Sequence, residues 1–321
     1  MTPPAGQRRP EPAPASTAWS LRLRLRLPEP YDLGWMLGFL ADRAAPALER
    51  VEPGLLVRVI RLAGAPAVLT VRHALDPATA RWLAVDGAAA APAAGPAAAP
   101  PSAHLRRLLR RMFDLDTALG PFLELARRDR LLGPLVARHP GLRLPQLPDP
   151  FEGAVRAIVG QQVSVAAART VVDRLIRQLG EPVDAAGRGL FAFPPPAAMA
   201  AASPERLAAL GLTRAKAAAL IAVAAATAGG AVDWERLRGA APEAAQAALL
   251  ALPGIGPWTA SYIRMRALGD RDAFPASDLG VIKALASLAP RTAVAGIAGL
   301  AERWRPFRAY AALHLWRSLS P

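Results

Sequence analysis

Hydrophobic and polar residues alternate strictly from Ser20 to Leu27, where leucine and arginine take turns in the string SLRLRLRL. Such an alternation of period two places one residue type on each face of a β-strand. Two more strands are predicted at LLVRVIRLAG and PAVLTVRHAL, joined at Gly64 and Ala65. Between the first strand and this pair, the segment WMLGFLADRAAPALERV carries apolar residues at helical spacing, which predicts a helix. Residues 20–86 are therefore predicted to form a small α+β domain.

The composition changes at residues 87–103, which begin with the low-complexity string GAAAAPAAGPAAAPP. Repeated prolines lack a backbone donor and interrupt any continuous helix, so we expect a linker there. From His104 onward nearly every segment has a helical pattern bounded by glycine, proline or a capping residue. These patterns are HLRRLLRRMFDLDTAL, FEGAVRAIVGQQ, VAAARTVVDRLIRQLG, SPERLAALG and TRAKAAALIAVAAATAGG. Residues 104–321 are predicted to be all-α.

The charge balance narrows the class of partner. The chain has 39 Lys and Arg residues against 25 Asp and Glu, a net charge of +14, which favours nucleic acid or an acidic membrane surface. No apolar run reaches the ~18 residues that suggest a membrane span. Residues 1–19 are rich in proline and alanine without the apolar core of a signal peptide, so we expect a disordered tail and a cytoplasmic protein.

Several chemistries are excluded by what the sequence lacks. Without cysteine there are no disulfides, thiolate-bound zinc, iron–sulfur clusters or thiol nucleophiles. There is no P-loop, HExxH, GxSxG or dinucleotide-binding fingerprint in a suitable context. The four histidines show no spacing typical of metal ligands. Metal and redox chemistry carried by side chains is therefore not expected.

The string LPGIG at Leu252–Gly256 precedes Pro257 at the start of a helical pattern. Two glycines two positions apart permit a tight turn between helices, and proline at the first helical position leaves neighbouring N–H groups pointing outward. A helix N-terminus with free amides binds a phosphate whatever the base sequence. The alternative is an ordinary glycine-rich turn, because glycine and proline occur in many turns.

Asp278 follows Trp258 by twenty residues and directly precedes the helical pattern LGVIKALASLA. An aspartate in this place most often caps the helix, and Ser277 is an equally good cap. Trp258, Tyr262 and Trp316 have the usual interpretation of core residues. Their other use is as faces on which an unstacked nucleic-acid base can lie. Both interpretations remain open at this point.

Four blocks in order resemble the helix–hairpin–helix DNA glycosylase superfamily, and within it the AlkA-type DNA-3-methyladenine glycosylase II family. They are PYDLGWMLGFLADRA, FEGAVRAIVGQQVSVAAA, the LPGIG hairpin and RWRPFRAYAALHLW. The resemblance covers nearly the whole chain from about Leu21. It implies an α+β fold: a small TBP-like N-terminal domain, then an all-α glycosylase core of two helical subdomains with a cleft between them.

The resemblance also implies roles for individual residues. Asp278 matches the catalytic aspartate. The residues that match the lining of the base pocket are Trp258, Tyr262 and Trp316, and those that match the DNA-binding hairpin are Leu252, Pro253, Gly254, Ile255 and Gly256. The backbone carbonyls of Leu250, Leu252 and Gly254 match a site for a monovalent cation, Na⁺ or K⁺, and no other cofactor is implied. Gln162 departs from the family, because the best-known member has an apolar residue there that fills the gap left by the flipped nucleotide. The alternative for Gln162 is a solvent-facing loop residue.

The implied reaction is hydrolysis of the N-glycosidic bond of alkylated purines, of the 3-methyladenine and 7-methylguanine type, flipped out of duplex DNA. Bifunctional relatives have a lysine where this chain has Trp258, so we expect a monofunctional enzyme. We expect a monomer that binds duplex DNA with alkylated bases, without a membrane partner, at the nucleoid of a bacterial cytoplasm. The alternatives are a non-catalytic helix–hairpin–helix DNA-binding protein and a glycosylase for oxidised or mismatched bases.

Overall fold

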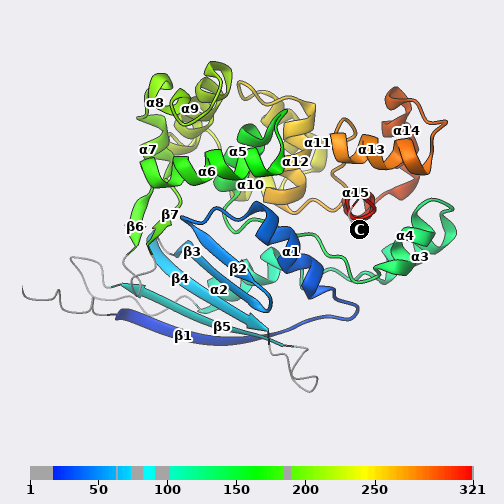
Figure 1. Ribbon diagram of the computed structural model, residues 1–321, viewed down its shortest axis with the longest axis horizontal. Coiled ribbons are helices and arrows are strands. Elements are labelled where there is room, and N and C mark those ends of the chain that lie inside the picture. Colours follow the sequence, from blue (N-terminus) through cyan, green and yellow to red (C-terminus); the bar gives the residue numbers. More distant parts are fainter. Residues whose placement is uncertain (1–16, 63, 74–81, 91–101, 184–188, 320–321) are drawn as a thin grey trace, which may run out of the picture.

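The structure is a computed structural model that describes residues 17–62, 64–73, 82–90, 102–183 and 189–319. A β-sheet domain lies on one side of the molecule and a larger helical region on the other (Figure 1). The predicted α+β fold is thereby confirmed. Within the described residues no helix is long and apolar enough to cross a membrane.

The N-terminal domain is an antiparallel sheet in the order β1-β5-β4-β3-β2. Its strands are β1 (Thr17–Arg26), β2 (Glu49–Glu52), β3 (Leu55–Leu62), β4 (Ala65–His73) and β5 (Trp82–Ala90). The alternation in β1 has the predicted effect: Leu23 and Leu25 are buried and pair with Val85 and Leu83. The predicted hairpin is β3–β4, closed by the pair Leu62 and Ala65.

The prediction of a helix that continues to Val51 is wrong beyond Arg43. Helix α1 covers Leu33–Arg43, and Asp32 caps it by accepting a hydrogen bond from the Trp35 N–H at 2.8 Å. Ala44 is already extended, and Ala45 precedes Pro46, a position from which the α conformation is disfavoured. The chain then enters β2, a strand that the sequence pattern did not predict.

Strand β5 was also missed, and it continues to Ala90, four residues into the segment 87–103 expected to be a linker. Alanine has no strand preference of its own, so only the pairing of β5 with both β1 and β4 reveals this strand. Residues 91–101 of the expected linker and 1–16 of the expected tail lie outside the described residues. Thr17–Trp19 of that tail belong to β1.

The region from Ser102 onward is helical except for one small hairpin. Its helices are α2 (Ser102–Met112), α3 (Gly120–Arg128), α4 (Leu132–Arg138), α5 (Pro150–Gly160), α6 (Val165–Leu179), α7 (Pro196–Ala200), α8 (Pro204–Ala208), α9 (Arg214–Ala228), α10 (Trp234–Gly239), α11 (Pro242–Leu250), α12 (Pro257–Ile263), η1 (Arg264–Leu268), α13 (Leu279–Leu288), η2 (Val294–Gly296), α14 (Ile297–Ala301), η3 (Glu302–Trp304) and α15 (Arg308–Arg317).

Two predictions for this region need correction. Strands β6 (Glu181–Val183) and β7 (Leu190–Ala192) interrupt the predicted all-α region, and the Phe191 N–H donates to the Ala47 carbonyl of the first domain. The helix predicted to start at His104 and continue to Leu119 ends at Met112. Asp114 has a φ of 51° and accepts hydrogen bonds from the Leu144 N–H and the Tyr310 hydroxyl, contacts that a continuing helix would lose.

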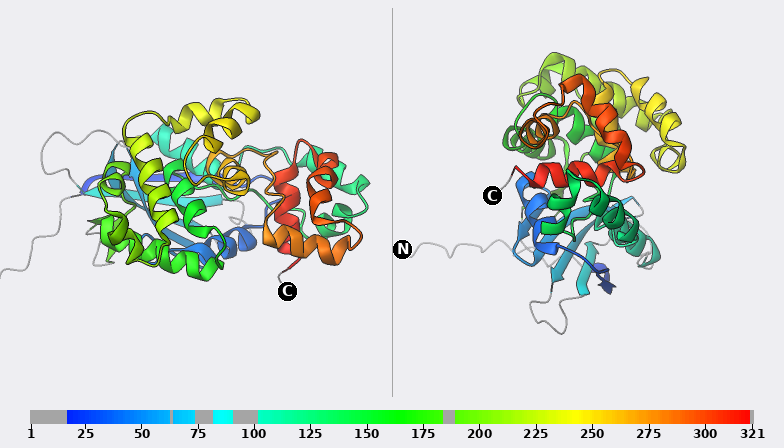
Figure 2. Two further views of the ribbon diagram at one scale, coloured as in Figure 1. Left: turned by 90° about the horizontal axis from the view of Figure 1, so that it is seen from above. Right: turned by 90° about the vertical axis from the view of Figure 1, so that its right-hand side faces the viewer.

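Three apolar cores divide the molecule. The first joins the sheet to α1 and α2, the second lies among α5 to α12, and the third joins α3 and α4 to α13–α15. Figures 1 and 2 show α3 and α4 beside the C-terminal helices, far along the chain from them. Two helical subdomains of the kind implied by the resemblance are therefore present.

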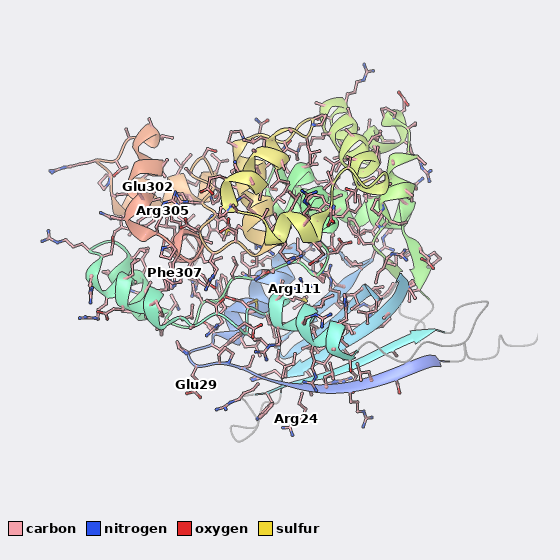
Figure 3. The ribbon with its side chains drawn as sticks, turned by 180° about the vertical axis from the view of Figure 1, so that it is seen from behind. Arg24, Glu29, Arg111, Glu302, Arg305 and Phe307 are labelled. Atoms are coloured by element: carbon pink, nitrogen blue, oxygen red, sulfur yellow. The ribbon has the colours of Figure 1, made fainter. Side chains whose placement is uncertain are left out.

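A buried network of ion pairs joins the sheet to the helices. Arg58 of β3 donates to Glu49 of β2 and to Glu152 of α5. Arg156 of α5 contacts Glu152 at 2.7 Å and Glu49 at 2.9 Å. Removing one partner would leave a buried charge uncompensated, so the network fixes α5 against the sheet. Other charged residues lie outside: Figure 3 shows Arg24 pointing away from the sheet domain and Arg305 near Glu302 on the helical side.

Candidate active site

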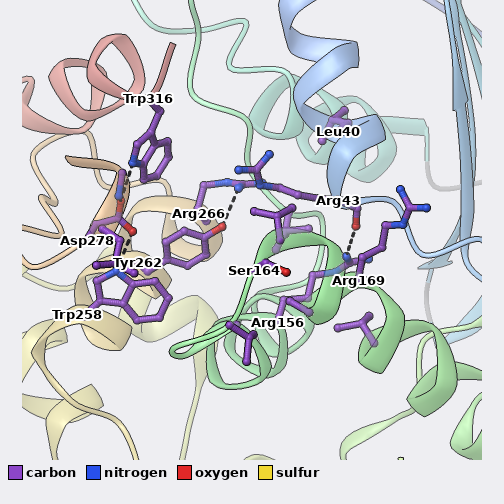
Figure 4. Close-up of a pocket in the computed structure, with 18 of the residues that line it drawn as sticks. Leu40, Arg43, Arg156, Ser164, Arg169, Trp258, Tyr262, Arg266, Asp278 and Trp316 are labelled. Atoms are coloured by element: carbon purple, nitrogen blue, oxygen red, sulfur yellow. Dashed lines mark hydrogen bonds between the residues drawn. The ribbon is translucent and has the colours of Figure 1, made fainter. Parts of the chain in front are cut away.

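Asp278 is the N-cap of α13 and also the centre of a set of hydrogen bonds. Its Oδ1 accepts from the N–H groups of Gly280 at 2.9 Å and Val281 at 3.1 Å. The indole N–H of Trp316 donates to Oδ1 at 2.8 Å, and that of Trp258 donates to Oδ2 at 3.0 Å (Figure 4). The structure confirms that Asp278 caps α13. Three of these four donors bind Oδ1, whereas Oδ2 accepts one hydrogen bond, from Trp258.

The three predicted aromatic residues come together around Asp278. Trp258 and Tyr262 lie one turn apart on α12, with ring centroids 5.3 Å apart and planes at 21°. Trp316 reaches them from α15, with its centroid 6.4 Å from that of Tyr262. A Cβ on Gly280 would lie 2.8 Å from Cδ1 of Trp316, so glycine permits this close approach. The aromatic surface is therefore built by two helices distant in sequence.

A cavity of about 430 Å³ opens beside this cluster. Asp278, Trp258, Tyr262 and Trp316 line it, together with residues from the sheet domain and from α6. Cavities of this size at a domain boundary, mostly apolar with a few directed polar groups, are typical of binding and catalytic sites. Figure 4 shows the two indole rings on either side of Asp278, with the arginines Arg43, Arg156 and Arg169 across the cavity.

Phe39 and the two arginines that lie against it, Arg43 and Arg266, were not identified as site residues from the sequence. Phe39 of α1 stacks on Trp316, with centroids 6.3 Å apart and planes at 22°. The guanidinium carbons of Arg43 and Arg266 lie 3.6 Å and 4.6 Å from the centre of the Phe39 ring. Phe39 follows Trp35 by one helical turn, which is also the pattern of ordinary core residues, so the sequence offered no separate signal.

Arg266 is buried and directs one amino group to the Tyr262 hydroxyl at 3.1 Å. Burial lowers the pKa of Arg266 to about 10, which still leaves the group charged at neutral pH. Burial alone would raise the pKa of Tyr262, but the charges of Arg266 and Arg43 outweigh it and lower that pKa below 10.0. In the described part of the chain no carboxylate forms an ion pair with Arg43 or Arg266. One wall of the cavity is therefore positively charged.

The LPGIG segment forms the predicted turn between α11 and α12. Gly254 has a φ of 75°, and a Cβ there would lie 2.4 Å from Cβ of Ala219 on α9, so glycine is required. Ile255 is buried and anchors the turn, whereas Pro253 and Gly254 are exposed and Leu252 is partly buried. Gly256 precedes Pro257 and α12 begins there without a side-chain cap. The turn thus presents backbone to solvent.

Gln162 lies in the loop between α5 and α6, where it is exposed and has a φ of 55°. Its neighbour Gln161 points the other way, into the LPGIG turn. The structure thus separates the two glutamines: one side chain is free toward solvent and the other is engaged. Among the described residues no cluster of His, Cys, Asp or Glu has the arrangement of a metal site.

The comparisons with known proteins agree with this geometry. Residues 22–149 match the AlkA N-terminal domain, and residues 155–294 match the HhH-GPD superfamily of base excision DNA repair proteins. The chain is 36% identical over 307 residues to DNA-3-methyladenine glycosylase 2 of Escherichia coli, covering 89% of this chain and 94% of that protein. The chain belongs to the AlkA family within this superfamily, as its sequence motifs predicted.

Two further relatives differ in extent. The "Probable bifunctional transcriptional activator/DNA repair enzyme AlkA" of Mycobacterium tuberculosis is also 36% identical, over 90% of this chain and 55% of its own length. This chain therefore spans about half of that relative. The solved structure of the 3-methyladenine DNA-glycosylase from Archaeoglobus fulgidus superposes with a TM-score of 0.78 at 25% identity, covering 92% of this chain and 97% of that one.

Proposed function

We propose that this protein is a monofunctional DNA glycosylase that hydrolyses the N-glycosidic bond of alkylated purines in duplex DNA. The observation that carries the proposal is the Asp278 carboxylate, held between the indole N–H groups of Trp258 and Trp316 at the edge of the 430 Å³ cavity. Membership of the AlkA family supports it. Asp278 and the aromatic residues around it form a complete site without a second copy of the chain, so we also propose that the protein acts as a monomer.

Asp278 would act on the sugar. When the bond between C1′ and the purine nitrogen breaks, its electron pair leaves with the base and positive charge develops on the deoxyribose. A fixed carboxylate stabilises this charge and orients a water, which adds to C1′ and loses its proton to the surrounding water. A purine alkylated at N3 or N7 is already cationic, so it leaves as a neutral base without prior protonation. The four donors around Asp278 hold the carboxylate in place before the reaction.

The aromatic cluster would receive the flipped base. A cation over an electron-rich ring gains roughly 0.5–2 kcal/mol, depending on desolvation, which favours an alkylated base over a normal one. The face of Phe39 is already covered by Arg43 and Arg266, so this preference would come from Trp258, Tyr262 and Trp316. The positive wall works against it for a cationic base. The range of lesions therefore depends on how far the base lies from that wall.

The LPGIG turn would bind the DNA backbone through exposed main-chain groups, without reading sequence. The net charge of +14 adds a general attraction to phosphates. We further propose a monovalent cation on the carbonyls of Leu250, Leu252 and Gly254. The Leu252 carbonyl accepts from the Ile255 N–H and that of Gly254 from the Gln161 amide, which leaves each oxygen a second lone pair for an ion.

We expect the enzyme to release the base without cleaving the strand, because cleavage would need an amine of this chain that reaches the sugar. Its two lysines are Lys216 and Lys283, and neither lines the cavity. Release of free base from alkylated duplex DNA, identified by mass, tests the proposal and gives the lesion range. Binding without any base release would instead establish a non-catalytic DNA-binding protein, and release of oxidised bases alone would replace the substrate class.

A further inference from the structure

Gln161 connects the loop between α5 and α6 to the LPGIG turn. Its side-chain amide donates to the Gly254 carbonyl at 2.9 Å and to the Thr259 hydroxyl at 2.8 Å. Gly254 is the exposed tip of the turn, and Thr259 is the buried residue directly after Trp258. One side chain therefore ties the loop both to the turn and to the start of the helix that carries the aromatic cluster.

Lys216 of α9 fixes the same loop from its other side. Its ammonium donates to the carbonyl of Val159 at 2.9 Å, in the last turn of α5, and to that of Gln161 at 2.6 Å, the first residue of the loop. A cation at the C-terminal end of a helix is favourable. Ser164 then starts α6 by accepting from the Ala167 N–H at 3.1 Å. The loop is thus held at both ends, and Gln162 is the residue pushed outward at its apex, with a φ of 55°.

We propose that Gln161 is a positioning residue that makes the loop and the LPGIG turn one rigid DNA-binding unit, and so sets how far Gln162 enters the duplex. This inference rests on the proposed function. In the glycosylase proposed above, the turn would bind phosphates and the exposed Gln162 would fill the space left by the flipped nucleotide, so the spacing between them must match the duplex. The two hydrogen bonds of Gln161 maintain that spacing without Gln161 touching the reacting base.

The test compares Gln161→Leu, Gln162→Ala and the double variant. Leucine keeps much of the bulk of glutamine but donates no hydrogen bond. Single-turnover excision from a fully paired site should slow about tenfold in Gln161→Leu, while affinity for undamaged duplex changes less than about threefold. Because Gln161 acts through Gln162, the double variant should be no slower than the slower single variant. If the two losses multiply instead, Gln161 acts independently and the proposal is wrong.

Three further measurements separate this role from general damage to the fold. Gln178 is exposed near the far end of α6, and Gln178→Leu should excise at the wild-type rate. Lys216→Met should reproduce the Gln161→Leu defect, because it releases the same loop. A mismatch opposite the lesion should restore most of the rate in Gln161→Leu, since flipping then costs less. A loss equal at paired and mismatched sites would show a merely structural residue.

A readout that needs no chemistry keeps the inference separate from the proposed function. The fluorescence of 2-aminopurine placed beside a synthetic abasic site rises when the base unstacks, whether or not the protein cleaves anything. Wild type should raise it, and Gln161→Leu should raise it by less than half as much at saturating protein. An enzyme inactive on all alkylated DNA that still shows this difference would refute the proposed function alone. An equal rise in both proteins would refute the positioning role.

Discussion

The indole nitrogen of Trp316 lies 2.8 Å from Oδ1 of Asp278, although 38 residues separate the two in sequence. In the proposed function Trp316 would do more than offer a surface to the base, because its indole N–H also orients the carboxylate. Trp316→Phe keeps an aromatic ring and removes this one donor. We expect single-turnover base release to slow about tenfold, the worth of one hydrogen bond to a charged group.

The chain offers a matched control for that substitution. Trp304 donates its indole N–H to Oδ2 of Asp129 at 3.0 Å, in the third core and away from the cavity. Trp304→Phe should lower thermal stability by at least as much as Trp316→Phe does. It should leave the rate of base release unchanged. Equal rates for Trp316→Phe and wild type would contradict the orienting role of Trp316.

The DNA product shows whether the enzyme only releases the base or also cleaves the strand. Since neither lysine lines the cavity, we expect an intact abasic strand that breaks only after alkali treatment. Borohydride added during the reaction should trap no covalent complex, as judged by gel shift of labelled DNA. A trapped complex would mean that an amine of this chain reaches the sugar and that the enzyme is bifunctional.

The two glycines of the LPGIG turn should respond differently to alanine. Gly254→Ala adds a Cβ 2.4 Å from that of Ala219 at a φ of 75°, so we expect a loss of about 1–3 kcal/mol of stability and weaker DNA binding. Gly256→Ala meets nothing within 4 Å and should have little effect on stability.

Salt titrations of these variants show what the turn binds. For wild type, the logarithm of affinity should fall with the logarithm of salt concentration by about 0.9 for each phosphate contacted. Gly254→Ala should reduce this slope and weaken duplexes of every sequence by the same factor. A loss confined to one sequence would indicate that the turn reads bases.

His314 gives the fold a pH dependence that is separate from catalysis. It is buried against Phe122, and within the described residues neither ring nitrogen has a hydrogen-bond partner. Burial, and to a smaller extent His139, lowers its pKa from 6.5 to about 3. Between these values the unfolded chain binds a proton that the folded protein does not, so stability is full above pH 6.5 and falls as the pH drops toward 3.

His314→Phe removes that titration and should flatten the loss, which amounts to roughly 3–5 kcal/mol over the whole window. Urea unfolding at pH 4.5 and pH 7.5 measures it. His104 is exposed, so His104→Phe should keep the wild-type difference between the two pH values. An unchanged difference in His314→Phe would show that other groups cause the acid sensitivity.

Local patterns in the sequence were sufficient where one segment determines its own structure. The alternation in β1, the β3–β4 hairpin, the LPGIG turn and the cap at Asp278 all follow from a few adjacent residues. Strand β5 could not be predicted in this way, because its alanines become a strand only by pairing with β1 and β4.

The site shows the same division. Trp258 and Tyr262 are one helical turn apart, so their proximity was readable from the sequence, and the motif resemblance added Trp316 and Asp278. Phe39 and Arg266 come from separate domains and meet only when α1 packs against the helical core. Nothing in the spacing of either residue marks it as different from a core phenylalanine or a surface arginine.

Asp278 carries the central claim, and Asp278→Asn tests it with the smallest change of shape. Asparagine caps a helix as well as aspartate does and loses only the acceptor for the Trp258 indole N–H, so the protein should stay folded and its duplex affinity should stay near that of wild type. Without the negative charge, single-turnover release of methylated purine from duplex DNA should fall at least about a hundredfold. Release at the wild-type rate by a folded Asp278→Asn protein would contradict the account.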